Sequence, residues 1–301
     1  MGRFSLTGVN SAITTPFKAD ESLDEPALRR EIEYQVGSGV NGVVMCSTPG
    51  EISELSLEER KWICEIAVDQ VVGRAAVIVD AGSPRTSWTI ELVKHVEKTG
   101  VPFVMVLSPW LLPQTEKTLY NHYLKIATAL KGDSKLILYN LPKYTNVSIP
   151  PTLFQQLIQE FPDKIEGIKD TSGSMKALQA YIEAADGKAR VVCGDDTMLL
   201  SALEIGADGC IAALAAFLPK QVLKMFELFR EGEIEEAQKI QSTLTKIKEE
   251  FHKYPYLAAQ KAAQTMLGRP SGHMRAPLVD LTEGEKRELR KNLVKLGVLE
   301  G

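Results

Sequence analysis

The 301-residue chain has few cysteines, no long apolar run and no strong excess of either charge. Its cysteines lie far apart, with no C-x-x-C pair and no nearby histidine doublet at metal-ligand spacing; they are Cys46, Cys64, Cys193 and Cys210. This spacing argues against a disulfide framework and against a zinc site, so we assign no metal ligands. We interpret the four residues as buried free thiols in a reducing compartment.

No segment approaches the roughly 18 consecutive apolar residues that a transmembrane helix needs. The amino terminus, MGRFSLTGVN, has no apolar core of a signal peptide. We therefore expect a cytoplasmic protein that does not engage a membrane. The formal net charge is −4, with both signs interspersed, which argues against nucleic acid as a partner. Small molecules are the expected ligands.

Short apolar runs rich in β-branched residues alternate with longer segments of helical period, as in parallel βαβ units. The predicted strands are 8–14, 42–47, 76–82, 102–108, 135–140, 165–170, 190–194 and 207–213. The predicted helices include 25–36, 57–72, 86–98, 116–130, 151–159 and 219–230. Eight strand–helix units of about 25–35 residues predict an α/β fold, the (β/α)8 TIM barrel.

The chain is expected to divide into a catalytic barrel over residues 1–231 and a C-terminal helical extension over 232–301. The second segment contains no convincing strand and has a loop near 268–277. Helix starts carry local signals in the barrel. Ser22 with Glu25 and Ser56 with Glu59 fit capping boxes, and Pro150-Pro151 suits a first helical turn.

The run Gly37–Gly42 satisfies the G-x-G-x-x-G pattern of dinucleotide sites. That pattern must follow a strand and open a helix, so that the phosphate meets the helix N-terminus. Here the glycines follow a predicted helix and precede a predicted strand. We interpret them as a helix end and a tight turn.

The active site of such a barrel lies at the carboxyl ends of its strands. Lys169 is the one lysine that we place there, after the apolar or small residues of strand 165–170. Loss of water favours the neutral amine, which attacks carbonyl carbon. The alternative is that Lys169 forms an ion pair with Asp170, or with a neighbouring carboxylate, at a solvated rim.

Tyr139 ends the strand one unit before Lys169 and can relay protons from that position. Thr48 follows another strand and can bind a substrate carboxylate or polarise Tyr139. Alternatively, Tyr139 is an aromatic residue of the core or rim, and Thr48 carries an ordinary loop hydroxyl. Further strand-end candidates for substrate binding are Ser47, Pro49, Gly50, Trp110, Thr171, Gly194 and Ile211.

From about residue 6 to 296, the chain resembles the family of dihydrodipicolinate synthases and N-acetylneuraminate lyases, which are Schiff-base class I aldolases. The motifs that carry the resemblance are AITTPF (12–17), STPGE (47–51), YNLP (139–142), GIKD (167–170), GDD (194–196) and GADG (206–209). It implies Lys169 as the Schiff-base lysine, Tyr139 as the proton-relay phenol and Thr48 as the hydroxyl beside it. It also implies a homotetramer, a pyruvate-type 2-oxo acid as substrate, and no metal or organic cofactor.

Three departures distinguish the chain from a typical dihydrodipicolinate synthase. Pro49 stands where those enzymes have a threonine that helps to hold the pyruvate carboxylate, and proline has neither hydroxyl nor N–H. Leu111 replaces a tyrosine contributed across a subunit interface. Tyr144 replaces the arginine for the semialdehyde carboxylate. These changes argue against a role in lysine biosynthesis.

Residues 275–278 and 167–173 look closer to the branch of the family that cleaves 4-hydroxy-2-oxo acids, although we expect these segments to lie partly outside the pocket. Reversible aldol cleavage to pyruvate and an aldehyde is therefore the leading hypothesis. The less polar pocket favours a neutral sugar-like or aromatic tail, which Trp110 and Tyr144 can contact.

Three alternatives remain open. The first is a 2-oxo sugar-acid dehydratase, in which the same iminium expels water. The second is 4-hydroxy-tetrahydrodipicolinate synthase itself. The third is a non-catalytic sugar-acid binder, and the intact Lys169 and Tyr139 argue against it because a binder needs no reactive amine.

Overall fold

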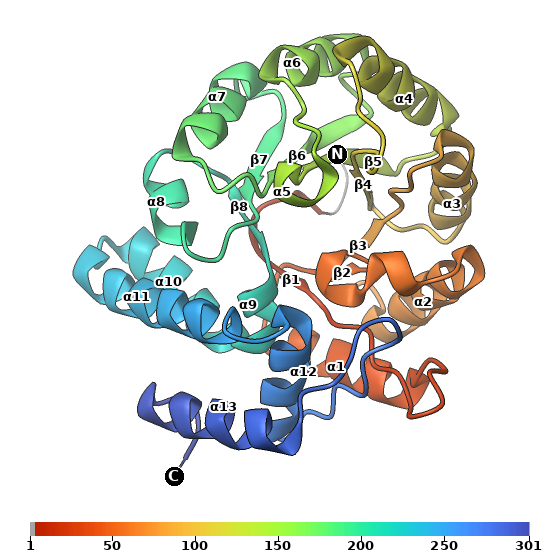
Figure 1. Cartoon of the computed structure of the whole chain (residues 1–301). Coiled ribbons are helices and arrows are strands. Elements are labelled where there is room, and N and C mark those ends of the chain that lie inside the picture. Colours follow the sequence, from red (N-terminus) through yellow and green to blue (C-terminus); the bar gives the residue numbers. More distant parts are fainter. Residues whose placement is uncertain (1–3, 301) are drawn as a thin grey trace.

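The computed structural model describes residues 4–300, so the ends of the two predicted segments, 1–3 and 301, lie outside the described residues. Within this range, eight parallel strands close into a barrel in sequence order, which confirms the predicted fold (Figure 1). The strands are β1 (Gly8–Ala12), β2 (Gly42–Met45), β3 (Ala76–Asp80), β4 (Phe103–Leu107), β5 (Lys135–Asn140), β6 (Ile165–Asp170), β7 (Arg190–Cys193) and β8 (Gly209–Ala212). The bounds of β5 and β6 match the prediction. The other strands are shorter than predicted: all six end earlier, and β4 and β8 also begin later.

Helices surround the strands as the outer ring seen in Figure 1. They are α1 (Glu25–Gly37), α2 (Leu57–Val71), α3 (Thr86–Lys98), α4 (Glu116–Ala129), α6 (Pro151–Glu160), α7 (Met175–Ala185), α8 (Leu199–Glu204) and α10 (Pro219–Glu231). Short turns that the sequence did not predict occupy loops after strands: η1 (Thr48–Gly50), η2 (Ile52–Glu54), α5 (Pro142–Thr145) and α9 (Ala213–Phe217).

Alternation along the strands separates two apolar sets. One set packs between the strands and the helices, and the other fills the barrel interior. The interior set includes Val44, Ile78, Met105, Ile137, Val192 and Ile211. Because these side chains close the barrel, a ligand has room only at one of its ends.

Local signals were partly right. Ser56 and Glu59 form the predicted capping box of α2. The predicted box at Ser22 is wrong, because Asp24 caps α1 by accepting from the Ala27 N–H, while Ser22 bonds to Asp20. The glycine run was interpreted correctly: α1 ends at Gly37 and β2 begins at Gly42.

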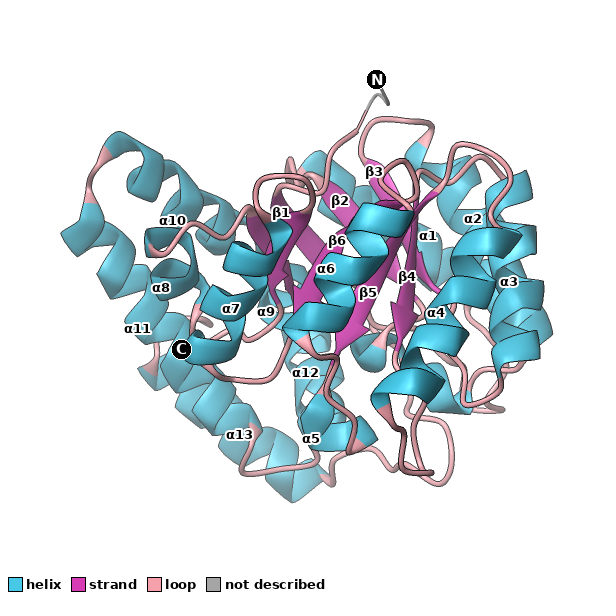
Figure 2. Cartoon of the chain, turned by 90° about the horizontal axis from the view of Figure 1, so that it is seen from above, coloured by secondary structure: helices cyan, strands magenta, loops and turns pink. Residues whose placement is uncertain are grey.

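The C-terminal segment is helical, with α11 (Ile234–Phe251), α12 (Tyr256–Met266) and α13 (Glu283–Lys295). Figure 2 shows α5 and α12 beyond the arrowheads of the strands, at the carboxyl end of the barrel. We propose to keep the division between a barrel through residue 231 and an extension from residue 232. In the described part of the chain, no helix is both long and apolar enough to cross a bilayer.

Candidate active site

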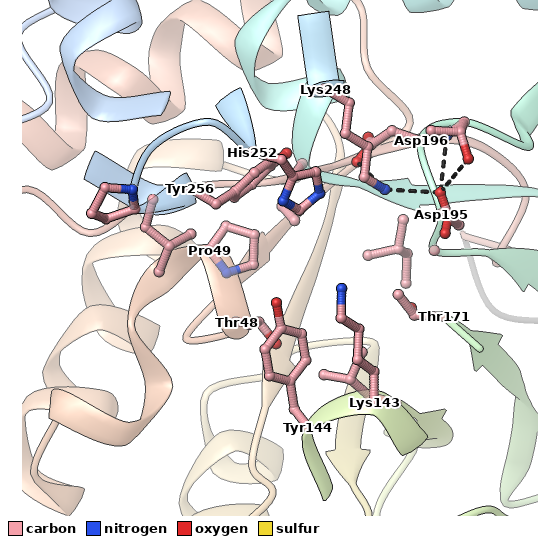
Figure 3. A pocket seen from close by; sticks show the side chains of 18 of the residues that line it. Thr48, Pro49, Lys143, Tyr144, Thr171, Asp195, Asp196, Lys248, His252 and Tyr256 are labelled. Carbon is pink, nitrogen blue, oxygen red and sulfur yellow. Dashed lines mark hydrogen bonds and ion pairs between the residues drawn. The ribbon is translucent and has the colours of Figure 1, made fainter. Parts of the chain in front are cut away.

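A cavity of about 710 Å³ lies where the strand ends meet the C-terminal extension (Figure 3). This volume is within the usual range for small-molecule sites. Strand ends and their loops contribute Ala12, Thr48, Pro49, Tyr139, Tyr144, Lys169, Thr171, Gly194 and Ile211, among others. The extension contributes Lys248, His252, Tyr256, Met274, Pro277, Leu278 and Val279, among others.

Lys169 lies in the cavity wall near the end of β6 and is 3% exposed. Its Nζ is 3.9 Å from the centroid of the Tyr139 ring, because β5 and β6 pair these two residues directly. The rim ion pair with Asp170 is not formed: that carboxylate accepts from Asn140 Nδ2 at 2.7 Å and from Ser172 Oγ at 2.7 Å. Within residues 4–300, Lys169 has no carboxylate within ion-pair distance, so its amine faces the cavity and the ring.

The Tyr139 hydroxyl lies 3.3 Å from Thr48 Oγ1. Tyr139 is 2% exposed, and Thr48 opens the turn η1 after β2. A hydrogen bond anchors this turn to the loop after β1, since Thr15 Oγ1 donates to the Gly50 carbonyl at 2.8 Å. An amine, a phenol and a hydroxyl from three strands thus meet at one wall of the cavity.

Gly194 is glycine because of its neighbours Thr171 and Lys169. A Cβ at this position would stand 1.9 Å from Thr171 Oγ1 and 2.8 Å from Lys169 Cε. The Thr171 hydroxyl is buried and has no hydrogen-bond partner in the described chain. A larger residue at Gly194 would therefore displace the lysine stem.

Two of the three departures from the family pattern lie at the cavity. Pro49 lines it directly, and Tyr144 stands at its rim with 62% of its surface exposed. Lys143 Nζ lies 5.9 Å from the centroid of the Tyr144 ring. The rim therefore carries an aromatic ring and a cation.

Four of the predicted substrate-binding residues are not among those that line the cavity. Ser47 and Gly50 are buried and do not line it. Trp110 packs partly buried against the barrel interior. Leu111 is 85% exposed, with a φ of 77°. The structure thus brings Lys169, Tyr139, Thr48, Pro49, Tyr144, Thr171, Gly194 and Ile211 together, and leaves these four outside.

The extension supplies lining residues that the sequence analysis missed. Lys248 Nζ donates to Asp195 Oδ1 at 2.8 Å and lies 3.6 Å from Asp196 Oδ2. Residues 275–278 were expected to lie partly outside the pocket, and they do: Pro277 and Leu278 line the cavity, while Arg275 and Ala276 are not among its lining residues. These residues do not lie at strand ends, because they come from helices and loops that fold back over the barrel.

Burial lowers the pKa of Lys248, but the charges of Asp196 and Asp195 outweigh it and raise that pKa overall. Lys248 therefore stays protonated and is unsuited to attack a carbonyl. Burial also lowers the pKa of His252, and the charges of Lys248 and Lys143 lower it further. His252 is thus favoured in its neutral form.

Across residues 4–300, no cluster of three or more His, Cys, Asp or Glu side chains is arranged to hold a metal ion. The residues at the cavity wall offer a different kind of chemistry. An enclosed amine beside a phenol is suited to form a covalent bond with a carbonyl carbon, and the phenol can move the accompanying protons.

Comparisons with known proteins agree with this chemistry. The model of the dihydrodipicolinate synthetase family matches residues 5–296. The chain is 35% identical over 295 residues to the 4-hydroxy-tetrahydrodipicolinate synthase of Methanothrix thermoacetophila. This match covers 98% of each protein.

Two solved structures are informative. YagE, a prophage protein of E. coli K12 solved in complex with pyruvate, is 30% identical with a TM-score of 0.93, and the match covers 97% of this chain and 99% of YagE. CdNal of Clostridium difficile, solved with mannosamine, shares the fold at 24% identity with a TM-score of 0.91, over 97% and 99% of the two chains.

Proposed function

Because the chain belongs to the dihydrodipicolinate synthetase family, we propose that it reversibly cleaves a 4-hydroxy-2-oxo acid into pyruvate and an aldehyde, through a Schiff base on Lys169. Enzymes of this family are class I lyases that hold pyruvate on a lysine and use no metal cofactor. The finer assignment, aldol cleavage, rests on the residues of this chain.

The observation that carries the proposal is the meeting of Lys169, Tyr139 and Thr48 at the cavity wall. The amine nitrogen of Lys169 adds to the C2 carbonyl, and loss of water leaves an iminium. The C3–C4 bond then breaks, its electron pair moves toward the iminium to give an enamine, and the C4 hydroxyl loses its proton as the aldehyde leaves.

Tyr139 is placed to relay these protons, and Thr48 to orient the phenol. The enamine next takes a proton at C3 and returns to the iminium. Addition of water releases pyruvate and restores the free amine of Lys169. The cycle consumes no oxidant, reductant or metal, and each proton that is removed is returned.

The size of the cavity supports a substrate longer than pyruvate, since about 710 Å³ leaves space beyond the three-carbon unit at Lys169. We assign Thr171, Gly194 and Ile211 to the wall around that unit, and Pro49 and Tyr144 to the tail. Neither Pro49 nor Tyr144 can clamp a carboxylate as a guanidinium does. This favours a neutral, sugar-like or aromatic tail.

A second candidate is 4-hydroxy-tetrahydrodipicolinate synthase, which the identity to the curated relatives favours. Against it stand Pro49 and Tyr144 at the cavity and Leu111 in place of the tyrosine. Following the family resemblance, we also propose a homotetramer. In that assembly the exposed loop around Leu111 would lie near a subunit contact.

The test is incubation of the purified protein with a panel of 4-hydroxy-2-oxo acids, with pyruvate measured by lactate dehydrogenase. Aldol cleavage releases pyruvate and an aldehyde in equal amounts. Consumption of substrate to a dioxo product without pyruvate would replace the proposal with the dehydratase. No consumption of any acid, together with synthesis from pyruvate and aspartate semialdehyde, would establish the synthase.

A further inference from the structure

A buried ion pair joins the turn that carries Thr48 to the C-terminal extension. The carboxylate of Glu51 contacts the ammonium of Lys261 on α12, and the two residues are 1% and 2% exposed. Lys261 Nζ also donates to the His273 carbonyl at 2.7 Å. The Arg275 N–H donates to Glu51 Oε2 at 3.3 Å. One carboxylate is thus held by two parts of the extension.

The backbone of Glu51 adopts a conformation that is unfavourable for a non-glycine residue. Glu51 lies between η1 and η2 with φ 57° and ψ 48°, the left-handed region that a non-glycine residue occupies only at a cost. Gly50, immediately before it, is packed closely, since an added Cβ would stand 3.2 Å from the Ile13 carbonyl and from Thr15 Oγ1. The conformation of the turn is therefore set by its surroundings.

Arg275 and Lys261 make further contacts beside a loop that lines the cavity. Arg275 Nη2 donates to Glu59 Oε1 at 2.7 Å, and its guanidinium lies 4.0 Å from the centroid of the Phe17 ring. Lys261 Nζ lies 4.8 Å from the same centroid. The loop that contains Arg275 supplies Met274, Pro277, Leu278 and Val279 to the cavity. Glu51 therefore ties the Thr48 wall to the wall built by the extension.

We propose that Lys261, acting through Glu51, is a positioning residue that holds Thr48 against the Tyr139 hydroxyl. Lys261 is not among the residues that line the cavity, and its effect passes through the turn. The inference rests on the proposed function only for the roles of Lys169, Tyr139 and Thr48. It requires no particular aldehyde.

The assay uses pyruvate alone, so that it does not depend on the cleavage reaction. In D2O, the iminium of pyruvate loses a methyl proton to give the enamine, which takes up deuterium, and hydrolysis releases deuterated pyruvate. The exchange rate is followed by NMR for wild type, Lys261→Met, Thr48→Val and the double variant. Lys239→Met, which removes an exposed ion pair with Glu236 on α11, is the matched control.

We expect Lys261→Met to slow exchange by about tenfold or more, as misplacement of catalytic groups does, while Lys239→Met leaves it unchanged. Because Lys261 acts through Thr48, the double variant should be no slower than the slower single variant, within about twofold to threefold. Reduction with borohydride should still label Lys169 in Lys261→Met. This separates lost positioning from a lost site.

Two results would overturn the inference. One is wild-type exchange in Lys261→Met with only a lower thermal midpoint. The other is a double variant whose loss equals the product of the two single losses.

If Lys261→Met does not fold, Glu51→Gln with Lys261→Met removes both charges and is measured in the same way. Slow exchange in that folded variant supports the positioning role, and wild-type exchange rejects it. Exchange by wild type without cleavage of any 4-hydroxy acid would refute the proposed function alone.

Discussion

Lys169 Nζ stands 3.9 Å from the centroid of the Tyr139 ring, while the hydroxyl of the same tyrosine lies 3.3 Å from Thr48 Oγ1. The ring therefore covers the amine, and the oxygen is turned toward the turn after β2. We therefore propose two separable roles for this one side chain. In this proposal the ring shields and orients Lys169, and the hydroxyl transfers protons.

Tyr139→Phe separates these roles, because it keeps the ring and removes the hydroxyl. We expect turnover to fall by more than about tenfold, since positioned acid–base catalysis contributes at least that much, while pyruvate still forms its adduct with Lys169. Tyr120→Phe removes a hydroxyl that is bonded to Glu160 outside the cavity and serves as the control. Steady-state kinetics measures both, and unchanged turnover in Tyr139→Phe would remove the phenol from the mechanism.

Condensation of pyruvate with aspartate semialdehyde should be near background. Tyr144 cannot form the bidentate carboxylate clamp of an arginine, and Leu111 cannot relay a proton. In the assay, any condensation product is consumed by the reductase that acts next in the pathway, and the activity of that reductase is followed. A turnover in the ordinary enzyme range of about 1–10³ per second would refute the argument from these residues.

His122 should make the fold less stable in mild acid. Burial lowers its pKa from the ordinary 6.5 to about 4, and its Nδ1 bonds to Thr86 Oγ1 at 2.9 Å. Between these two values the unfolded chain binds the proton and the folded chain does not. The free energy of unfolding therefore falls as the pH drops from about 6.5 to about 4, by up to about 3 kcal/mol.

The measurement is urea unfolding of wild type and His122→Asn at several pH values between 7 and 4. An asparagine can keep a polar atom near Thr86 and does not titrate in this range. We expect the variant to lose less stability than wild type over the interval. An identical pH dependence in the two proteins would show that His122 does not contribute.

The sequence predicted the barrel because the hydrophobic periods of strands and helices are local features. The predicted bounds of β5, β6 and α3 agree with those of the structure. The sequence also predicted the meeting of Lys169, Tyr139 and Thr48, since parallel strands in a barrel bring their carboxyl ends to one face. Features without a periodic pattern were not predicted. The short helix α5 and the left-handed turn at Glu51 had no such signal.

The contacts of the extension could not be predicted for a related reason. Lys261 meets Glu51, and Lys248 meets Asp195, across long separations in the chain. The hydrophobic pattern of each helix is equally compatible with a lysine that is exposed to solvent. Only the path of the chain over the barrel shows that both lysines point inward. Leu111 illustrates the opposite case, since a strand-end position there leads to an exposed side chain.

Covalent attachment of the substrate to Lys169 can be measured directly. The protein is incubated with pyruvate and borohydride, digested, and mapped by mass spectrometry. We expect irreversible inactivation and a single reduced pyruvyl group on Lys169, with none in Lys169→Ala and normal labelling in Lys248→Met. Absence of the adduct in wild type, or equal labelling of Lys169→Ala, would contradict it.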